Sequence, residues 1–246
     1  ALLLDGLLER AESGGGGPEE RARLLRMRGQ VKHLSHDYKG VLELWRQHPE
    51  IGLLPVLVAR ALVQLCRLED AQDFIARALG EGGLEPFDRA QLLYIQAFIP
   101  HFAADYEAAE AHFSAFLGTL EQLDDGSPRY HDLWGGIYQL RAYARNALGN
   151  PRGAAEDIRA VLRIAAEQGN GGAYAFRQSE LGLYLLECGE FAQAEEVLLE
   201  SRGVLERLGQ RIYLARLEMI TARLYLEWAL PHGPALVLRH ARAGVA

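Results

Sequence analysis

The sequence has few of the residues that build covalent or metal-bound sites. Cysteine occurs only as Cys66 and Cys188 in 246 residues, far apart and without metal-ligand spacing around either. A disulfide framework is therefore not indicated, which fits a protein of the reducing cytoplasm. Both thiols are interpreted as small, partly buried hydrophobic side chains. Lysine is limited to Lys32 and Lys39, so arginine carries the remaining positive charge.

Long hydrophobic runs and excess positive charge are also missing. The longest apolar run, 51–66, contains Pro55, Arg60 and Gln64. It is shorter than the roughly 20 residues that a membrane-spanning helix needs. The net charge of −7 disfavours direct nucleic-acid binding, which depends on a positive surface. With 49% hydrophobic residues, the composition is that of a soluble protein with a sizeable core, and we expect it in the cytoplasm.

Strand signals are scarce, and apolar residues recur at intervals of three and four, as they do on helices. Glycine and proline clusters interrupt this pattern and predict where helices stop and start. The interruptions fall at 13–18, 48–52, 80–86, 124–128, 149–151, 169–172, 189–190, 209–210 and 231–234. The sequence therefore predicts an all-α protein built from antiparallel helical hairpins.

One pattern recurs along the chain and is clearest in the stretch FAADYEAAEAHFSAFLG at 102–118. A turn residue is followed by a small residue, and a large apolar residue comes four positions later. A second small residue lies twelve positions before the first. The first small positions are Val41, Ala71, Ala109, Ala154 and Ala194; the large ones are Trp45, Ile75, Phe113, Ile158 and Leu198; the earlier small ones are Gly29, Ala59, Ala97, Ala142 and Gly182. Paired helices approach closely only where side chains are nearly absent, so this pattern predicts tight hairpins.

This arrangement of small, aromatic and large positions resembles the tetratricopeptide repeat over about residues 20–230. The repeats are long for this family, like those in sensor domains of bacterial transcription activators. The resemblance implies a right-handed α-solenoid of five to six antiparallel hairpins over residues 19–246, after an orphan helix and glycine-rich loop at 1–18. The implied units are about 22–51, 52–85, 90–124, 135–170, 175–210 and 212–243.

The sixth unit departs from the pattern. Arg223 stands where a small residue is expected and Arg239 where a large one is expected, although Ala235 is in place. We interpret this unit as a cap with a polar outer face. Because the chain begins with alanine and with an orphan helix, we expect it to be a fragment of a longer protein.

Catalytic and metal-binding patterns are weak. His33 and His36 lie three residues apart, a spacing that metal sites use, but Asp37 fits better as a turn residue than as a third ligand. The glycine run at 14–17 lacks the Lys-Ser/Thr of a phosphate loop. We therefore expect no catalytic residues, metal or cofactor. A hydrolase acting on an anionic substrate near Arg23, Arg26 and His33 remains an alternative.

The resemblance also implies a concave groove lined by the first helix of each hairpin. The side chains that it places there are Arg26, Gln30, His33, Arg60, Gln64, Tyr94, Phe98, His101, Gln139, Tyr143, Asn146 and Ser179. Arginine can hold carboxylates, and tyrosine, glutamine and asparagine can bond a peptide backbone. The competing interpretation is an ordinary polar helix face.

The sequence thus favours a scaffold that binds a protein or peptide, as the sensing or assembly domain of a bacterial regulatory protein. The alternative is a structural module that assembles with further copies of itself or with flanking domains, through an end such as ALVLRHARAGVA at 235–246.

The pattern predicts the effect of enlarging one small residue. Replacing Ala109 with leucine should overpack the closest helix contact and lower the free energy of unfolding by about 1–3 kcal/mol. Urea unfolding followed by circular dichroism measures this change. An unchanged unfolding midpoint would argue against a close contact at this position.

Overall fold

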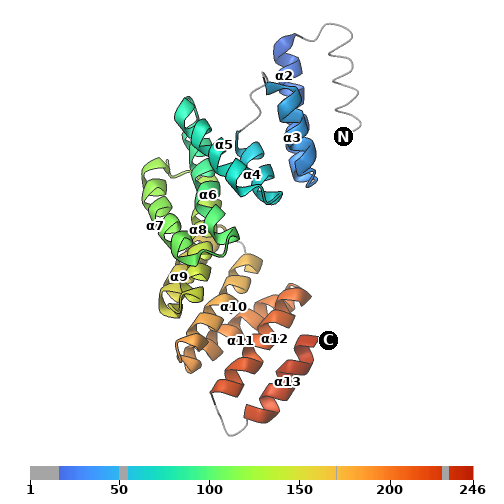
Figure 1. Ribbon diagram of the computed structural model, residues 1–246. Coiled ribbons are helices and arrows are strands. Elements are labelled where there is room, and N and C mark those ends of the chain that lie inside the picture. Colours follow the sequence, from blue (N-terminus) through green and yellow to red (C-terminus); the bar gives the residue numbers. More distant parts are fainter. Residues whose placement is uncertain (1–16, 50–54, 170, 229–232, 246) are drawn as a thin grey trace. The chain divides into compact units, whose positions relative to one another are not determined.

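A computed structural model describes residues 17–49, 55–169, 171–228 and 233–245, and within these ranges it contains helices and no strand. The all-α prediction is therefore confirmed (Figure 1). The predicted orphan helix before residue 17 lies outside the described residues. The helices are α2 (Pro18–Leu34), α3 (Tyr38–Gln47), α4 (Pro55–Gln64), α5 (Leu68–Glu81), α6 (Pro86–Phe102), α7 (Tyr106–Leu123), the 3-10 turn η2 (Pro128–Tyr130), α8 (His131–Ala147), α9 (Pro151–Glu167), α10 (Gly171–Glu187), α11 (Phe191–Arg207), α12 (Arg211–Glu227) and α13 (Gly233–Val245).

The chain divides into two compact units, the N-terminal unit Ala1–Ala103 and the C-terminal unit Ala104–Ala246. Even-numbered helices are called A helices and odd-numbered ones B helices. In the N-terminal unit α4 packs against α2, α3, α5 and α6. In the C-terminal unit each helix from α8 to α12 packs against the next. The A helices α8, α10 and α12 begin at His131, Gly171 and Arg211, so the interval between their starts is the same each time.

The recurring turn residues begin the B helices. The side chains of Asp37, Asp105 and Asn150 accept hydrogen bonds from the backbone amides of Gly40, Ala108 and Gly153, respectively. Such caps satisfy amides that have no partner within the helix. The residue before each cap, His36, Ala104 or Gly149, lies in the left-handed region. Gly149, for example, has a φ of 76°. The turn residue of FAADYEAAEA, Asp105, is therefore a helix cap.

The small residues of the pattern lie at the contacts between helices. Val41, Ala71, Ala109, Ala154 and Ala194 are all fully buried. At Gly182 a Cβ atom would lie 2.6 Å from side-chain atoms of Leu198, the large residue of the paired helix. Because real Cβ atoms do not come so close to other heavy atoms, any larger residue at this position would force the side chain of Leu198 to shift.

The sixth unit fits the pattern better than the sequence indicated. Ala222 lies at the same position in α12 as Gly182 in α10, counted from the start of each helix. It is buried, as the small residue of the pattern should be. Arg223, in contrast, is on the surface and pairs with Glu187 and Glu227. In α13 the buried side chain is His240, not its neighbour Arg239. The small residue of α12 is therefore Ala222, one position before Arg223, whereas the buried His240 of α13 lies one position after Arg239, and Ala235 is exposed.

His240 also takes part in a polar contact within the sixth unit. It bonds the buried carboxylate of Glu218 on α12, which pairs with Arg202 of α11 as well. The contact therefore ties α13 to the two helices before it.

A buried carboxylate joins three helices of the C-terminal unit. Asp157 of α9 is almost inaccessible and accepts two hydrogen bonds from Arg141, at 2.6 and 3.0 Å, and one from Arg145 at 3.1 Å. Arg145 also donates to Glu110, and Arg141 to Ser114, both on α7. The two guanidinium groups of α8 therefore neutralise two acids and connect α7 with α9.

Removing one member of this network should be costly. Asp157→Asn should lower the free energy of unfolding by about 3 kcal/mol, because it leaves Arg141 and Arg145 with an uncompensated charge in a largely buried position. The control is Asp70→Asn, which breaks the exposed pair with Arg67 and should cost less than about 1 kcal/mol. Urea unfolding compares the two variants, and equal losses would contradict the structural role of Asp157.

Candidate functional site

The A helix α6 carries a continuous stack of rings in the N-terminal unit. The rings of Tyr94 and Phe98 lie 6.4 Å apart, those of Phe98 and His101 5.3 Å apart, and Phe102 meets Phe98 edge-on at 4.6 Å. Residues 94, 98 and 101 are spaced by four and three, so they share one face of the helix. The structure therefore brings together the three α6 residues that the sequence placed in a groove.

Arg60 of α4 relates this ring stack to α2. Burial raises the pKa of Tyr94, and the positive charge of Arg60 opposes this effect. On α2, burial lowers the pKa of His33, and the charge of Arg60 lowers it further. His33 also packs edge-on against Tyr38, with ring centroids 5.7 Å apart. The charge of Arg60 thus reaches side chains of both neighbouring A helices.

Two polar atoms of predicted site residues are buried without a hydrogen-bond partner among the described residues: Nδ1 of His33 and Oδ1 of Asn146. Buried polar atoms are normally bonded to protein or to ordered water. These two atoms lie on A helices, His33 on α2 and Asn146 on α8. Each marks a position where a further polar group could bind.

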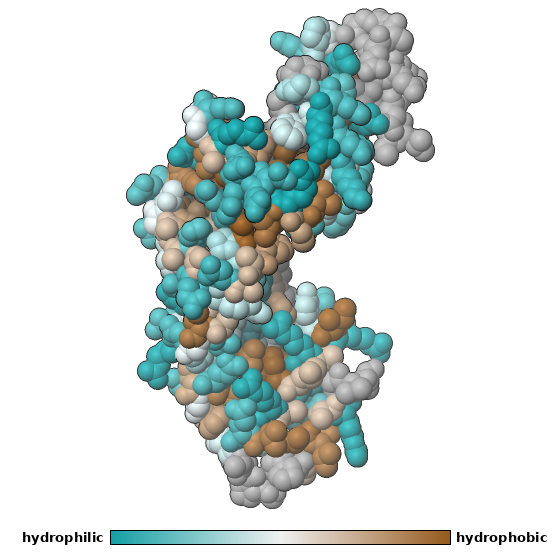
Figure 2. Space-filling view, in the orientation of Figure 1, coloured by the Kyte–Doolittle hydropathy of each residue, from teal (hydrophilic) through white to brown (hydrophobic). Residues whose placement is uncertain are grey.

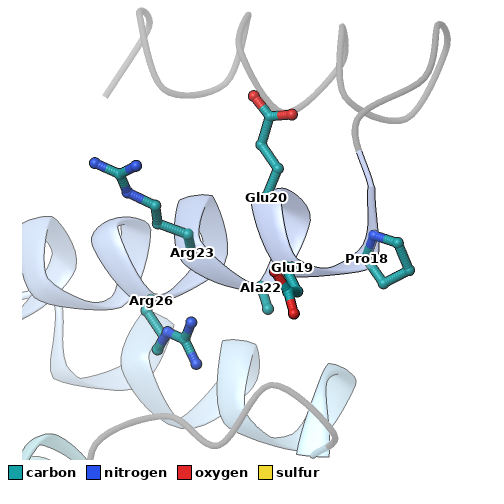
Figure 3. A pocket seen from close by; sticks show the side chains of 6 residues that line it. All are labelled: Pro18, Glu19, Glu20, Ala22, Arg23 and Arg26. Atoms are coloured by element: carbon teal, nitrogen blue, oxygen red, sulfur yellow. The ribbon is translucent and has the colours of Figure 1, made fainter.

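The remaining predicted residues of the N-terminal unit, Arg26, Gln30 and Gln64, are exposed. Arg26 also lines an open hollow along the start of α2, together with Glu19, Glu20 and Arg23. In Figure 3 Glu20 and Arg23 extend from one side of the helix and Arg26 from the other. The two guanidinium groups do not converge, so this hollow offers no focused anion site.

Three of the four predicted residues in the C-terminal unit are accessible. Tyr143 is 52% exposed and its ring lies 6.1 Å from that of Tyr106. Gln139 lines a pocket, and Asn146 is half-buried. Ser179, in contrast, is completely buried, and its hydroxyl donates to the carbonyl oxygen of Phe176 at 2.6 Å. A ligand on the surface therefore cannot reach Ser179 in this structure.

The pocket beside Gln139 has a volume of about 260 Å³ and is formed by α8, α9 and α10. Its apolar side chains are Val161, Ile164 and Ala165 of α9 with Ala173 of α10. Two glycines of α8, Gly135 and Gly136, form part of its wall. The polar side chains around it are His131, Asp132, Gln139, Gln168 and Arg177. The pocket is therefore lined by both apolar and polar side chains, and the polar ones are called its rim.

Next to this pocket, two guanidinium groups lie over the ring of Phe176. Arg177 and Arg216 have their central carbons 4.9 and 5.2 Å from the ring centroid, and the ring of Tyr213 lies 4.6 Å away. The buried carboxylate of Glu180 pairs with Arg177 at 2.8 Å and with Arg216 at 3.6 Å. This single acid fixes both arginines on one side of α10 and α12.

The sequence analysis identified neither of these arginines. Arg216 follows Phe176 by the same interval that separates the starts of α10 and α12. Reading α12 in the register of Ala222 instead of Arg223 would have found Arg216 at the position equivalent to Phe176. No repeat position identifies Arg177. Its place is visible only in the structure, where it lines the pocket and pairs with Glu180.

Within residues 17–49, 55–169, 171–228 and 233–245, no three His, Cys, Asp or Glu side chains gather as they would around a metal ion. In the same part of the chain, no helix combines the length and the hydropathy that a membrane crossing requires.

The chain is similar in structure to helical repeat proteins. BtubC (BKLC) from P. vanneervenii is 18% identical, with 85% of this chain and 90% of that chain covered and a TM-score of 0.67. RapI in its apo form is 13% identical, with 99% and 69% covered and a TM-score of 0.74. TPR-like repeats of a kinesin-light-chain-type protein from Podosopora anserina are 17% identical, with 78% and 93% covered and a TM-score of 0.60.

No family model matches the sequence, and no curated protein is significantly similar to it. The structural similarities establish the fold: the chain is an all-α, tetratricopeptide-like helical repeat protein. The predicted resemblance to tetratricopeptide repeats is confirmed at this level.

Two partly buried histidines predict how stability depends on pH. Burial lowers the pKa of His33 and of His101 below 6.5. Between the lowered values and 6.5 the folded protein binds fewer protons than the unfolded chain, so stability rises with pH. The contribution of these residues is complete above pH 6.5 and is lost as the pH falls.

Nuclear magnetic resonance titration should find both imidazoles titrating below pH 6.5. Urea unfolding should show a lower free energy at pH 5.5 than at pH 7.5, and His33→Gln with His101→Gln should reduce that difference. Titration midpoints above 6.5 would show that burial does not govern these groups.

Proposed function

We propose that the chain is a scaffold that binds a protein or peptide on the A-helix faces of its two units. One observation carries this proposal: in each unit, rings and guanidinium groups gather on A helices. In the N-terminal unit they are the stack of Tyr94, Phe98 and His101 with Arg60. In the C-terminal unit they are Phe176 with Arg177 and Arg216.

The chemistry of these faces suits an extended polypeptide. Aromatic rings offer large rigid contact areas, and arginine can bond carboxylates through two parallel hydrogen bonds. Peptide backbone groups can pair with amide side chains such as Gln139 and Asn146, and with the unpartnered imidazole atom of His33. The arginine and amide side chains would find no hydrogen-bond partner on a purely apolar ligand.

At a finer level, we propose that the scaffold is the sensing or assembly domain of a bacterial regulatory protein in the cytoplasm. The support is the long and regular interval between the starts of the A helices α8, α10 and α12, which is like that of repeats in bacterial sensor domains. Flanking domains of a longer chain would then read out the bound state. We propose no catalytic role and, given the net charge of −7, no direct contact with nucleic acid.

The proposal predicts that peptides selected on the wild-type protein depend on A-helix side chains. Peptides from a displayed library are selected on the immobilised chain, and their dissociation constants are measured by calorimetry. Arg60→Ala combined with Tyr143→Ala should weaken the selected peptides at least tenfold, because each change removes a side chain from one A-helix face.

The matched control changes two exposed residues of B helices, Arg77→Ala and His112→Ala, and should leave affinity unchanged. Equal affinity of all selected peptides for the A-helix variant and the control would refute binding on these faces. The single variants then show whether one unit or both units contribute.

Self-assembly is a second candidate function, and one observation favours it. Ile212, Met219 and Leu226 recur every seven residues on α12 and are 83%, 65% and 68% exposed. Figure 2 also shows hydrophobic surface over the region of α10–α13. Exposed apolar stripes of this kind pair helices. Light scattering that reports a monomer at every concentration would remove this candidate.

A further inference from the structure

We propose that the pocket formed by α8, α9 and α10 binds one uncharged aromatic side chain, such as tryptophan, of a peptide ligand. This inference rests on the proposed function, because it identifies the residue type that anchors a peptide on the C-terminal unit. It concerns this unit alone and involves only described residues.

The size of the pocket limits the ligand. Pockets for drug-sized molecules span roughly 300–1,000 Å³. At about 260 Å³ this pocket is smaller, and it suits a single large side chain. Its apolar lining comes from Val161, Ile164, Ala165 and Ala173. A ring that enters it would exchange water for aliphatic contacts, the main source of affinity for anchoring side chains.

No contact among the described residues requires glycine at Gly135. Glycine inside a helix is less favourable than alanine, because it loses more backbone freedom on folding. At Gly182 the structure explains the glycine, since a Cβ atom would lie 2.6 Å from Leu198. At Gly135 a Cβ atom would meet no atom within 4 Å. The missing side chain therefore leaves space inside the pocket wall that no other group fills.

The rim favours a neutral aromatic ring over an anion. Arg177 is held by Glu180 at 2.8 Å and lies over Phe176, so its guanidinium is fixed beside the pocket. A planar guanidinium can also interact with a second ring. Asp132 places an acid on the same rim, which disfavours a carboxylate ligand. Gln139 and Gln168 supply amides that can bond the peptide backbone on either side of the inserted residue.

The test uses N-acetyl-tryptophanamide, a neutral aromatic probe with two peptide bonds. Added to the whole chain, it should produce saturable nuclear magnetic resonance shifts at the amides of Gly135, Ala165 and Ala173. Gly135→Leu should weaken this binding at least tenfold by filling the pocket. Gly118→Leu is the matched control, because Gly118 also lies within a helix and a Cβ atom there meets nothing within 4 Å. Both variants gain helix propensity, so a difference between them reports the pocket.

A second variant keeps the test decisive if Gly135→Leu does not fold, as judged by circular dichroism. Arg177→Gln should weaken N-acetyl-tryptophanamide about fivefold and leave N-acetyl-leucinamide unchanged, since only a ring interacts with the guanidinium face. The inference is overturned if the wild type shows no saturable shifts at the pocket. It is equally overturned if Gly135→Leu binds as well as Gly118→Leu, or if Arg177→Gln affects both probes equally.

The outcomes separate this inference from the proposed function. Selected peptides that depend on Arg60 and Tyr143 but bind Gly135→Leu normally would refute the pocket and leave the scaffold in place. Probe binding that Gly135→Leu abolishes, in a chain that selects no peptide, would establish the pocket and refute the scaffold.

Discussion

The close approach of paired helices is the constraint on which the repeat depends. Where α10 meets α11, the side chain of Leu198 occupies the space next to Gly182. A Cβ atom on residue 182 would collide with it. A larger residue would push the helices apart and open a void, which costs contacts on both sides. The same separation lets A helices lie next to one another, so it also sets the spacing of the side chains that they present.

Polar interactions then decide which arginines remain for binding. On α8, Arg141 and Arg145 are committed to Asp157 and Glu110, and their role is to hold α7, α8 and α9 together. On α10 and α12, Glu180 alone serves both Arg177 and Arg216. This second cluster has one more base than acid, and its guanidinium planes face a ring. Arginine thus stabilises the fold on α8 and forms part of a surface on α10 and α12.

The fold was predictable from the sequence because its signals are local. Asp105 and Asn150 cap helices that they precede by one residue, and the small positions follow helix periodicity. The site was predictable only in part. Tyr94, Phe98 and His101 share one helix face, as the sequence predicted, whereas Ser179 is buried because its neighbours on α10 face the core. A shift of one residue in α12 hid Arg216, since a helix turns about 100° per residue.

Glycine shows most clearly why three-dimensional information was needed. Gly182 and Gly135 both lie within A helices, and the repeat pattern marks only Gly182 as a position of close approach. One is required because a neighbour occupies the space of its Cβ atom, and the other leaves that space empty. Helix propensity opposes both residues equally, at roughly 0.5–1 kcal/mol each. Packing offsets that cost at Gly182, and at Gly135 no packing within the described chain does. Gly118 shares this property, but of the two only Gly135 lines the pocket of α8, α9 and α10, where a ligand ring would contact it.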